Sequence, residues 1–217
     1  MTKLVYLVGK TGAGKSTTAQ KLQTALAARN VPTFILRFAY PLHNLAVKVF
    51  GHNDTSLKNL PVAQTTESTN QLILALEEFI EDMGKPADAL YWEDLLPLLN
   101  QRVLSPRMLM NAAGHAARQL DNAIFARAAE RTAVGLAEKY KDAVIIFEDA
   151  RFHEEVSPMG DIVLLESGER GVVQSIDELY HDYVTEQLKQ KYTVLDVRTP
   201  EATDKSIQEY VEKLLSK

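Results

Sequence analysis

The sequence predicts an α/β protein in which a parallel sheet of about five strands carries helices on both faces. Three observations support this prediction. Short apolar runs alternate with amphipathic helical stretches along most of the chain. A glycine-rich turn joins the first apolar run to the first helical stretch. Parallel strands need a crossover helix to bring the chain back, and this alternation is typical of such a sheet.

The composition limits the kind of protein this is. Its 217 residues, with 46% hydrophobic and 24% charged residues, suit one large globular domain or a domain with a small lid. A net charge of −5 disfavours a protein that coats a nucleic-acid polymer, because duplex binding needs a basic surface. The absence of cysteine excludes disulfides and cysteine nucleophiles. With no signal-peptide pattern and no long apolar stretch, we expect a cytoplasmic protein without a membrane partner.

The first half of the chain begins with a strand at residues 4–8, followed after residue 16 by a helix with apolar residues at helical spacing. A second strand is expected at residues 33–38. Pro41 opens the next helix and Gly51 closes it.

The middle of the chain interrupts the alternation. Residues 51–70 are rich in polar turn residues and predict an exposed loop. Helices are expected at residues 70–83 and 89–101. We therefore expect a single domain spanning residues 1–217, with a helical excursion at about 51–104 that lies over the carboxyl edge of the sheet.

The second half returns to alternation. Ser105 and Pro106 predict an N-cap and a first helical residue, and this helix runs to about residue 120. Further helices are expected at 122–140 and 175–189 and at the C-terminus, with strands at 144–147, 161–165 and 192–197, and a lid-like segment at about 166–190.

Residues 9–17, here called the phosphate loop, fit the pattern Gly-x-x-x-x-Gly-Lys-Ser between a strand and a helix. This context favours the three-layer P-loop NTPase fold. Backbone N–H groups and the helix start would bind the phosphates of ATP, Lys15 would reach the β- and γ-phosphates, and Ser16 would ligate Mg²⁺. The predicted nucleotide-binding residues are Gly9, Lys10, Thr11, Gly12, Ala13, Gly14, Lys15, Ser16 and Thr17.

Ligands of such sheets bind at the carboxyl ends of the strands. Asp149 follows an apolar strand and is our first candidate for a second magnesium ligand, with Glu148 as the other choice. Arg151 follows a strand and Arg37 lies at the end of one, and both are candidates to bind phosphate. An ion pair with a neighbouring acid remains the other interpretation of Arg151.

The helix from Pro106 carries a stripe of four residues with helical spacing, namely Arg107, Asn111, Gly114 and Arg118. Two arginines on one face suit a doubly charged phosphate, and a mid-helix glycine usually has a packing or functional reason. This arginine stripe is the predicted acceptor site. We expect Lys15, Arg118, Arg151 and Asp149 to be catalytic, with Arg170 a candidate lid arginine.

Four segments belong together: the phosphate loop, Arg-Phe-Ala-Tyr-Pro-Leu at 37–42, Pro-Arg-Met-Leu through Gly-His to Arg at 106–118, and Glu-Asp-Ala-Arg-Phe to Glu at 148–155. Together they resemble the phage-type deoxynucleoside monophosphate kinases, a branch of the P-loop kinases. Tyr40 departs from the family, which usually has an acid there, and Glu166 stands where the family often has an arginine.

The resemblance implies transfer of a phosphoryl group from Mg-ATP to a deoxynucleoside 5′-monophosphate, in the host cytoplasm if the protein is phage-encoded. The expected partners are small nucleotides, with a homodimer left open. Two alternatives remain: a P-loop kinase for a hydroxyl acceptor such as a nucleoside or a dephospho-CoA-like molecule, and an ATP-driven switch or assembly protein. A hydroxyl acceptor would need a carboxylate base such as Asp149 or Glu148.

Overall fold

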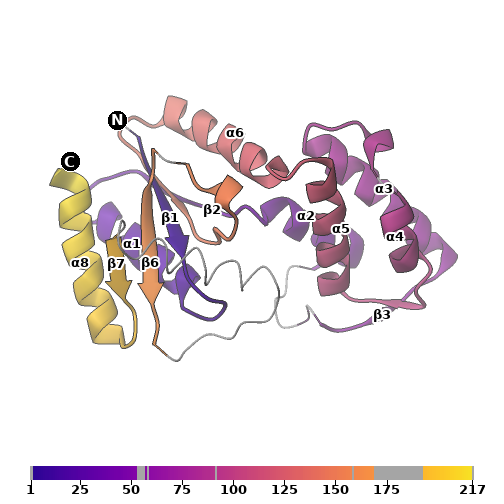
Figure 1. Cartoon of the computed structure of the whole chain (residues 1–217), viewed down its shortest axis with the longest axis horizontal. Coiled ribbons are helices and arrows are strands. Elements are labelled where there is room, and N and C mark those ends of the chain that lie inside the picture. The colour runs from indigo at the N-terminus through magenta and orange to yellow at the C-terminus, as the bar shows by residue number, and fades with distance from the viewer. Residues whose placement is uncertain are drawn as a thin grey trace. The chain divides into compact units, whose positions relative to one another are not determined.

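The structure is a computed structural model that describes residues 2–52, 57, 59–90, 92–157, 159–168 and 193–216. The chain forms two compact units (Figure 1). Met1–Phe38 and Ala129–Lys217 build the first unit, here called the sheet unit. Ala39–Ala128 builds the second, here called the helical unit.

The sheet unit contains five parallel strands in the order β2-β5-β1-β6-β7. The central strand β1, Lys3–Val8, pairs with β5, Val144–Phe147, and with β6, Asp161–Glu166. The edge strands are β2, Thr33–Leu36, and β7, Thr193–Asp196. The predicted parallel sheet is confirmed, although β2 ends two residues before the expected end at 38.

Helices cover both faces of this sheet. On one face, α1, Lys15–Ala27, and α8, Pro200–Ser216, pack against alternate strand residues. The core of this layer includes Val5, Leu7, Leu22, Leu26, Ile146, Val163, Leu195, Val211 and Leu214. Alternation along the strands then directs their other side chains to the opposite face.

The opposite face is built around stacked aromatic rings. The ring centroids of Tyr6 and Phe147 lie 4.8 Å apart, and those of Phe38 and Phe147 lie 4.9 Å apart. Burial raises the pKa of Tyr6, and the charge of Glu130 on α6, Ile124–Lys139, adds to this rise. Ala133 of α6 is buried, and the ring centroid of Tyr140, directly after α6, lies 4.7 Å from that of Phe34 on β2, so the C-terminal part of α6 covers this face and confirms the three-layer α/β arrangement.

The helical unit packs α2, Tyr40–Phe50, against α3, Thr66–Asp82, and against α5, Pro106–Leu120. The short helix α4, Trp92–Leu99, packs on α5. Its core is mainly aliphatic, with the buried rings of Phe79 and Phe125, and its fully buried side chains include Leu45, Leu72, Leu76, Ile80, Leu95, Leu104 and Leu109. Gly51 ends α2 in the left-handed region with φ 74°, as expected for this glycine.

Residues 51–70 differ from the predicted loop at two places. The helix α3 begins at Thr66 instead of residue 70, because the side chains of Thr65 and Ser68 cap each other's backbone N–H groups. Val62–Ala63 forms β3, which pairs antiparallel with β4, Val103–Leu104. Most of the lid-like segment at 166–190, with Arg170 and the helix expected at 175–189, lies outside the described residues.

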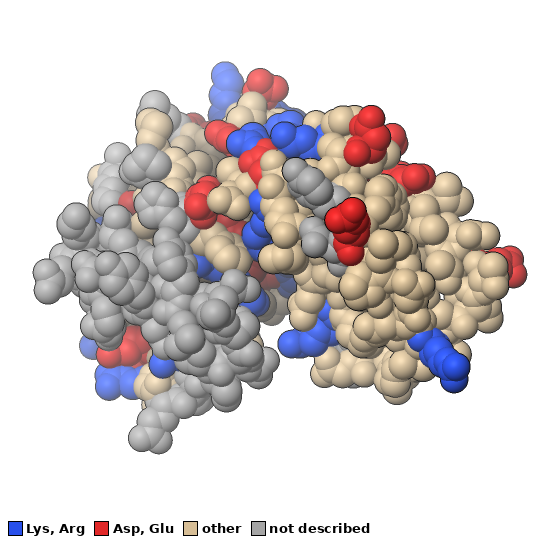
Figure 2. Space-filling model, turned by 45° about the vertical axis from the view of Figure 1, so that its right-hand side comes forward, with Lys and Arg blue, Asp and Glu red and all other residues tan. Residues whose placement is uncertain are grey.

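The surface is charged without a single dominant sign on the face shown in Figure 2, where basic and acidic side chains of the described residues lie interspersed. Among the helices that the structure describes, none has the length and apolar character needed to cross a bilayer.

Candidate functional site

The phosphate loop has the backbone shape that its glycines permit. Gly12 and Gly14 adopt φ values of 82° and 90°, which other residues rarely adopt. Gly9 has a different reason to be glycine, because a Cβ there would lie 3.2 Å from the Cβ of Leu165 on β6. The loop therefore depends on backbone freedom at two positions and on close packing at a third.

The N-terminus of α1 opens directly into this loop. The N-cap is Gly14, which offers no side-chain cap, and the first turn carries no acidic residue. The N–H groups of this turn are therefore not capped by the N-cap side chain, and an anion would also meet the positive end of the helix dipole.

Lys15 folds its ammonium group back over the loop. Its Nζ donates hydrogen bonds to the carbonyl oxygens of Gly9 and of Lys10, the second at 3.0 Å. The loop is closed from within by a bond of 3.0 Å from the N–H of Ala13 to the same Lys10 carbonyl. A cation is thus held at the mouth of the loop, where it can attract phosphate oxygens.

Two acidic residues that follow β5 bind residues that follow β2. Leu36 pairs with Phe147, so the residues that follow these two strands lie at the same level. Glu148, whose side chain is 3% exposed, forms an ion pair with Arg37, which is 47% exposed. Arg37 therefore shares its charge with a buried carboxylate.

Asp149 lies at the edge of the sheet that carries the phosphate loop. Strand β5 also pairs with β1 in the register Tyr6–Phe147, so Asp149 is level with Val8, directly before the loop. Its Oδ1 accepts a hydrogen bond of 2.8 Å from the backbone N–H of Phe38. The carboxylate is half-buried and anchors the chain after β2.

The oxygen donors at this edge fit magnesium. Ser16 offers an exposed hydroxyl and Asp149 a carboxylate, and Mg²⁺ prefers such oxygen ligands. In the part of the chain that the structure describes, no three His, Cys, Asp or Glu residues gather as a metal cluster. Magnesium bound mainly by phosphates needs only one or two protein ligands, and these two side chains are of the kind that serves.

Beyond Asp149 the chain turns and places Arg151 on the surface. The turn is held by Glu155, a buried residue whose Oε2 accepts hydrogen bonds from the backbone N–H groups of Arg151 and Phe152. The sequence alone does not show this contact, because Glu148, Asp149 and Glu155 are all acids close to the end of one strand and any of them could have made it.

The arginine stripe lies in the helical unit on α5, and its members differ in burial. Arg107 and Asn111 are exposed, Gly114 is buried and Arg118 is half-buried. The guanidinium carbon of Arg118 lies 4.9 Å from the ring centroid of Phe125, a cation–π geometry. A Cβ on Gly114 would lie 3.2 Å from Leu42 Cδ1 and 3.6 Å from Arg118 Nη1. Close packing against Leu42 therefore explains why a glycine stands in the middle of this helix.

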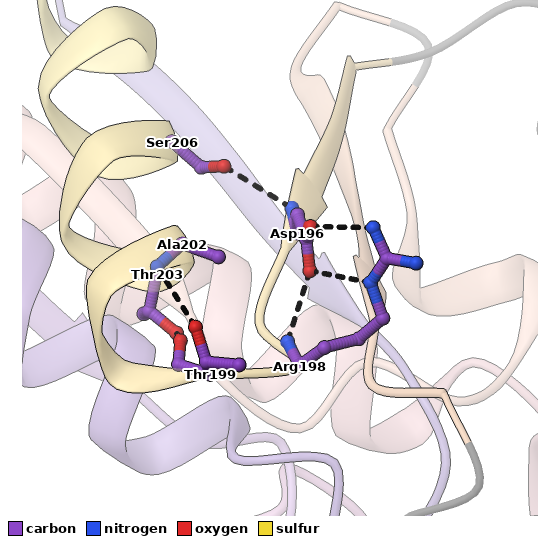
Figure 3. A network of polar contacts seen from close by, with 6 residues as sticks. All are labelled: Asp196, Arg198, Thr199, Ala202, Thr203 and Ser206. Carbon is purple, nitrogen blue, oxygen red and sulfur yellow. Dashed lines mark hydrogen bonds and ion pairs between the residues drawn. The ribbon is translucent and has the colours of Figure 1, made fainter.

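A charged pair at the end of β7 was not predicted from the sequence. The carboxylate of Asp196 accepts from Nε and Nη2 of Arg198 at 2.9 and 2.7 Å, and it also accepts from the backbone N–H of Arg198 (Figure 3). These bonds lower the pKa of Asp196 to about 2. The sequence shows only that Asp196 and Arg198 have opposite charges and lie two residues apart at the end of a strand, which does not by itself predict an ion pair.

The predicted site residues thus fall into two groups. The sheet unit brings the phosphate loop, Arg37, Asp149 and Arg151 to the carboxyl ends of neighbouring strands. The arginine stripe belongs to the helical unit. Glu166, at the end of β6, is exposed.

Comparisons with known proteins show only distant likenesses. No protein-family model matches the chain, and no curated protein matches it. A shikimate kinase from Bacteroides thetaiotaomicron is similar over 98% of both chains, with 14% identity and a TM-score of 0.35. A dephospho-CoA kinase from Campylobacter jejuni is similar over 99% of this chain and 98% of its own, with 12% identity and a TM-score of 0.43.

Proposed function

We propose that this protein is a nucleotide kinase that transfers the γ-phosphoryl group of Mg-ATP to a deoxynucleoside 5′-monophosphate. The proposal rests on the phosphate loop. Gly12 and Gly14 give this loop a left-handed backbone turn, Gly14 caps the start of α1, and the ammonium group of Lys15 is hydrogen-bonded to the loop backbone. Such a turn binds the phosphates of a nucleoside triphosphate and presents the lysine to the transferring group.

The donor half of the reaction uses this loop and the adjacent strand ends. Ser16 and Asp149 would hold Mg²⁺, whose charge neutralises the phosphate oxygens. Lys15 stabilises charge on the β- and γ-phosphates, and Arg151 is the candidate that meets the transferring group from the end of β5.

The acceptor half needs positive charge more than it needs a base. A nucleoside monophosphate has a second pKa of about 6, so it is already mostly ionised near neutral pH and can attack without losing a proton. The reaction then depends on holding two anions in line. Arg107, Asn111 and Arg118 of the arginine stripe, together with Arg37, are the proposed acceptor ligands, and the deoxyribose preference is the one that the family resemblance implies.

A second candidate is a kinase for a hydroxyl acceptor. The half-buried carboxylate of Asp149 at the end of β5 favours it, because a hydroxyl nucleophile needs a carboxylate base within reach. The arginine stripe favours a phosphate acceptor over a nucleoside, since a neutral nucleoside gives two arginines no anion to bind.

The deciding experiment is a panel of acceptors with Mg-ATP, following ADP release. The panel contains ribo- and deoxynucleoside monophosphates, the matching nucleosides and dephospho-CoA. We expect ADP release to depend on a deoxynucleoside monophosphate and the diphosphate to appear. Turnover with nucleosides or dephospho-CoA alone would support the hydroxyl-acceptor kinase. Slow hydrolysis that no acceptor stimulates would support an ATP-driven switch.

Lys15→Ala should abolish this turnover, because the lysine charge stabilises the transferring phosphoryl group. Lys21→Ala is the matched control. Lys21 lies more than one and a half turns further along α1 and pairs with Asp204 on the surface, so its loss should leave the rate unchanged. Equal rates for the Lys15→Ala variant and the wild type would contradict the proposed donor site.

A further inference from the structure

The segment after β5 contains a glutamate whose carboxylate points back into the protein. Glu155 ends a short 3₁₀ turn, His153–Glu155, and is only 7% exposed. Its Oε2 accepts hydrogen bonds from the backbone N–H of Arg151 at 2.7 Å and from that of Phe152 at 3.1 Å. A single carboxylate oxygen therefore binds two successive peptide groups.

Such a contact has a clear energetic reason. A carboxylate removed from water is costly unless it is hydrogen-bonded, and backbone N–H groups are strong donors to it. Breaking one of the two bonds would leave a buried charge with less compensation. The peptide planes at Arg151 and Phe152 are consequently fixed relative to the buried side chain of Glu155.

Arg151 is held on its other side as well. Two residues before it, Asp149 is bonded to the backbone N–H of Phe38. The backbone around Arg151 thus lies between two carboxylate anchors, while its own side chain is exposed. Among the residues that the structure describes, its guanidinium has no ion-pair partner. The segment holds the base of this arginine and leaves its charge available.

We propose that Glu155 is a positioning residue for phosphoryl transfer and acts by fixing the backbone from which Arg151 reaches a phosphate oxygen. This inference rests on the proposed kinase function. An arginine that starts from a fixed backbone loses less freedom when it binds, and small displacements of a group that meets the transition state have large effects on rate. Glu155 itself does not touch the nucleotide in this scheme.

The test is a double-mutant cycle of Glu155→Gln and Arg151→Ala, with steady-state kinetics under Mg-ATP and the best acceptor of the panel. The glutamine oxygen can still accept from the two N–H groups, but its neutral bonds are about half as strong as those of the carboxylate, so the backbone at Arg151 is held less firmly. We expect Glu155→Gln to lower kcat by about 10-fold with little change in the KM for ATP, because the weaker hold on its backbone displaces the guanidinium of Arg151 from the transferring phosphate. In the Arg151→Ala background the same substitution should have no further effect.

Glu154→Gln is the matched control, because Glu154 is the exposed neighbour of Glu155 and should leave kcat unchanged. Thermal unfolding of each variant shows whether it is folded. If Glu155→Gln does not fold, Glu155→Asp retains the charge on a shorter side chain and enters the same cycle. An equal loss of rate with and without Arg151 would overturn the inference, since Glu155 would then act by general stabilisation. A wild type that transfers phosphate to no acceptor would instead contradict the proposed function.

Discussion

The carboxylate of Asp149 accepts a hydrogen bond of 2.8 Å from the backbone N–H of Phe38. This bond joins the end of β5 to the last residue of the sheet unit, directly before the helical unit begins at Ala39. Asp149 thus anchors the backbone, and in the proposed function it also ligates magnesium. The two roles need different properties of the side chain, an acceptor oxygen for the first and a negative charge for the second.

Substitution at Asp149 separates these roles. Asp149→Asn retains an oxygen that accepts from Phe38 but removes the charge, so we expect near-normal stability and a loss of kcat of about 100-fold at limiting magnesium. Asp149→Ala should also lose about 1–3 kcal/mol of unfolding free energy, because the N–H of Phe38 loses its partner. Urea unfolding and magnesium titrations of the rate measure both effects. Wild-type rates in Asp149→Asn at every magnesium concentration would remove Asp149 from the metal site.

Two helical glycines offer a matched comparison. Gly135 of α6 is exposed and a Cβ there would have nothing within 4 Å, so Gly135→Ala should stabilise by about 0.5–1 kcal/mol through helix propensity. Gly114→Ala gains the same propensity but must displace the Leu42 methyl group, which would lie 3.2 Å from the new Cβ. We expect it to be less favourable by about 1 kcal/mol in urea unfolding. Equal stabilisation by both substitutions would show that Gly114 is not needed for packing.

Arg118 should contribute to acceptor binding through its planar guanidinium. Arg118→Ala is expected to lower kcat/KM for the acceptor by about 100-fold, whereas KM for ATP changes little. Arg118→Lys should restore only part of this, because lysine lacks the forked donors and the stacking on Phe125. Arg102→Ala, at an exposed position in the same unit, is the control. Unchanged acceptor kinetics in Arg118→Ala would exclude the arginine stripe from the acceptor site.

The pair formed by Asp196 and Arg198 predicts an acid-dependent stability difference. The Arg198 guanidinium holds the pKa of Asp196 at about 2, below its usual value near 3.9. A carboxylate with a lowered pKa in the folded state stabilises the protein above its unfolded pKa, and this stabilisation is lost as the pH falls through the folded pKa.

The melting temperatures of the wild type and Asp196→Asn should therefore differ most above about pH 4 and converge towards about pH 2. Because the pair is exposed, added salt should reduce the difference. Arg198→Ala removes the cation but leaves the backbone N–H that also bonds Asp196, so it should reduce the acid-dependent part without abolishing it. A difference that stays constant over this pH range would show that the ion pair does not contribute.

The elements that the sequence predicts are those formed by interactions between residues close together along the chain. The phosphate loop joins a strand to a helix with residue types that suit that geometry, and β1 and α1 lie on either side of it as expected. The start of α5 is equally local, since Ser105 accepts a hydrogen bond from the N–H of Met108 and Pro106 takes the first helical position.

The features that escaped prediction depend on distant partners or on equivalent side chains. The two-residue strands β3 and β4 are too short to show alternation, and they pair across a long stretch of chain. The cap of α3 uses Ser68 where the usual capping box has Glu or Gln, so residues 65–68 resemble a loop. In the site, Glu148, Asp149 and Glu155 are all acids near one strand end, and only the fold distinguishes which one binds Arg37, Phe38 or Arg151.

The strand order also constrains how the chain can fold as it is synthesised. Strands β1 and β2 come first, but β5 lies between them in the sheet, and β1 pairs only with β5 and β6 among the described strands. Neither early strand has a sheet partner until Val144–Phe147 leaves the ribosome, by which time the helical unit Ala39–Ala128 has been made. A ribosome that pauses between residues 129 and 147 would prolong the exposure of two apolar strands and favour aggregation of the nascent chain.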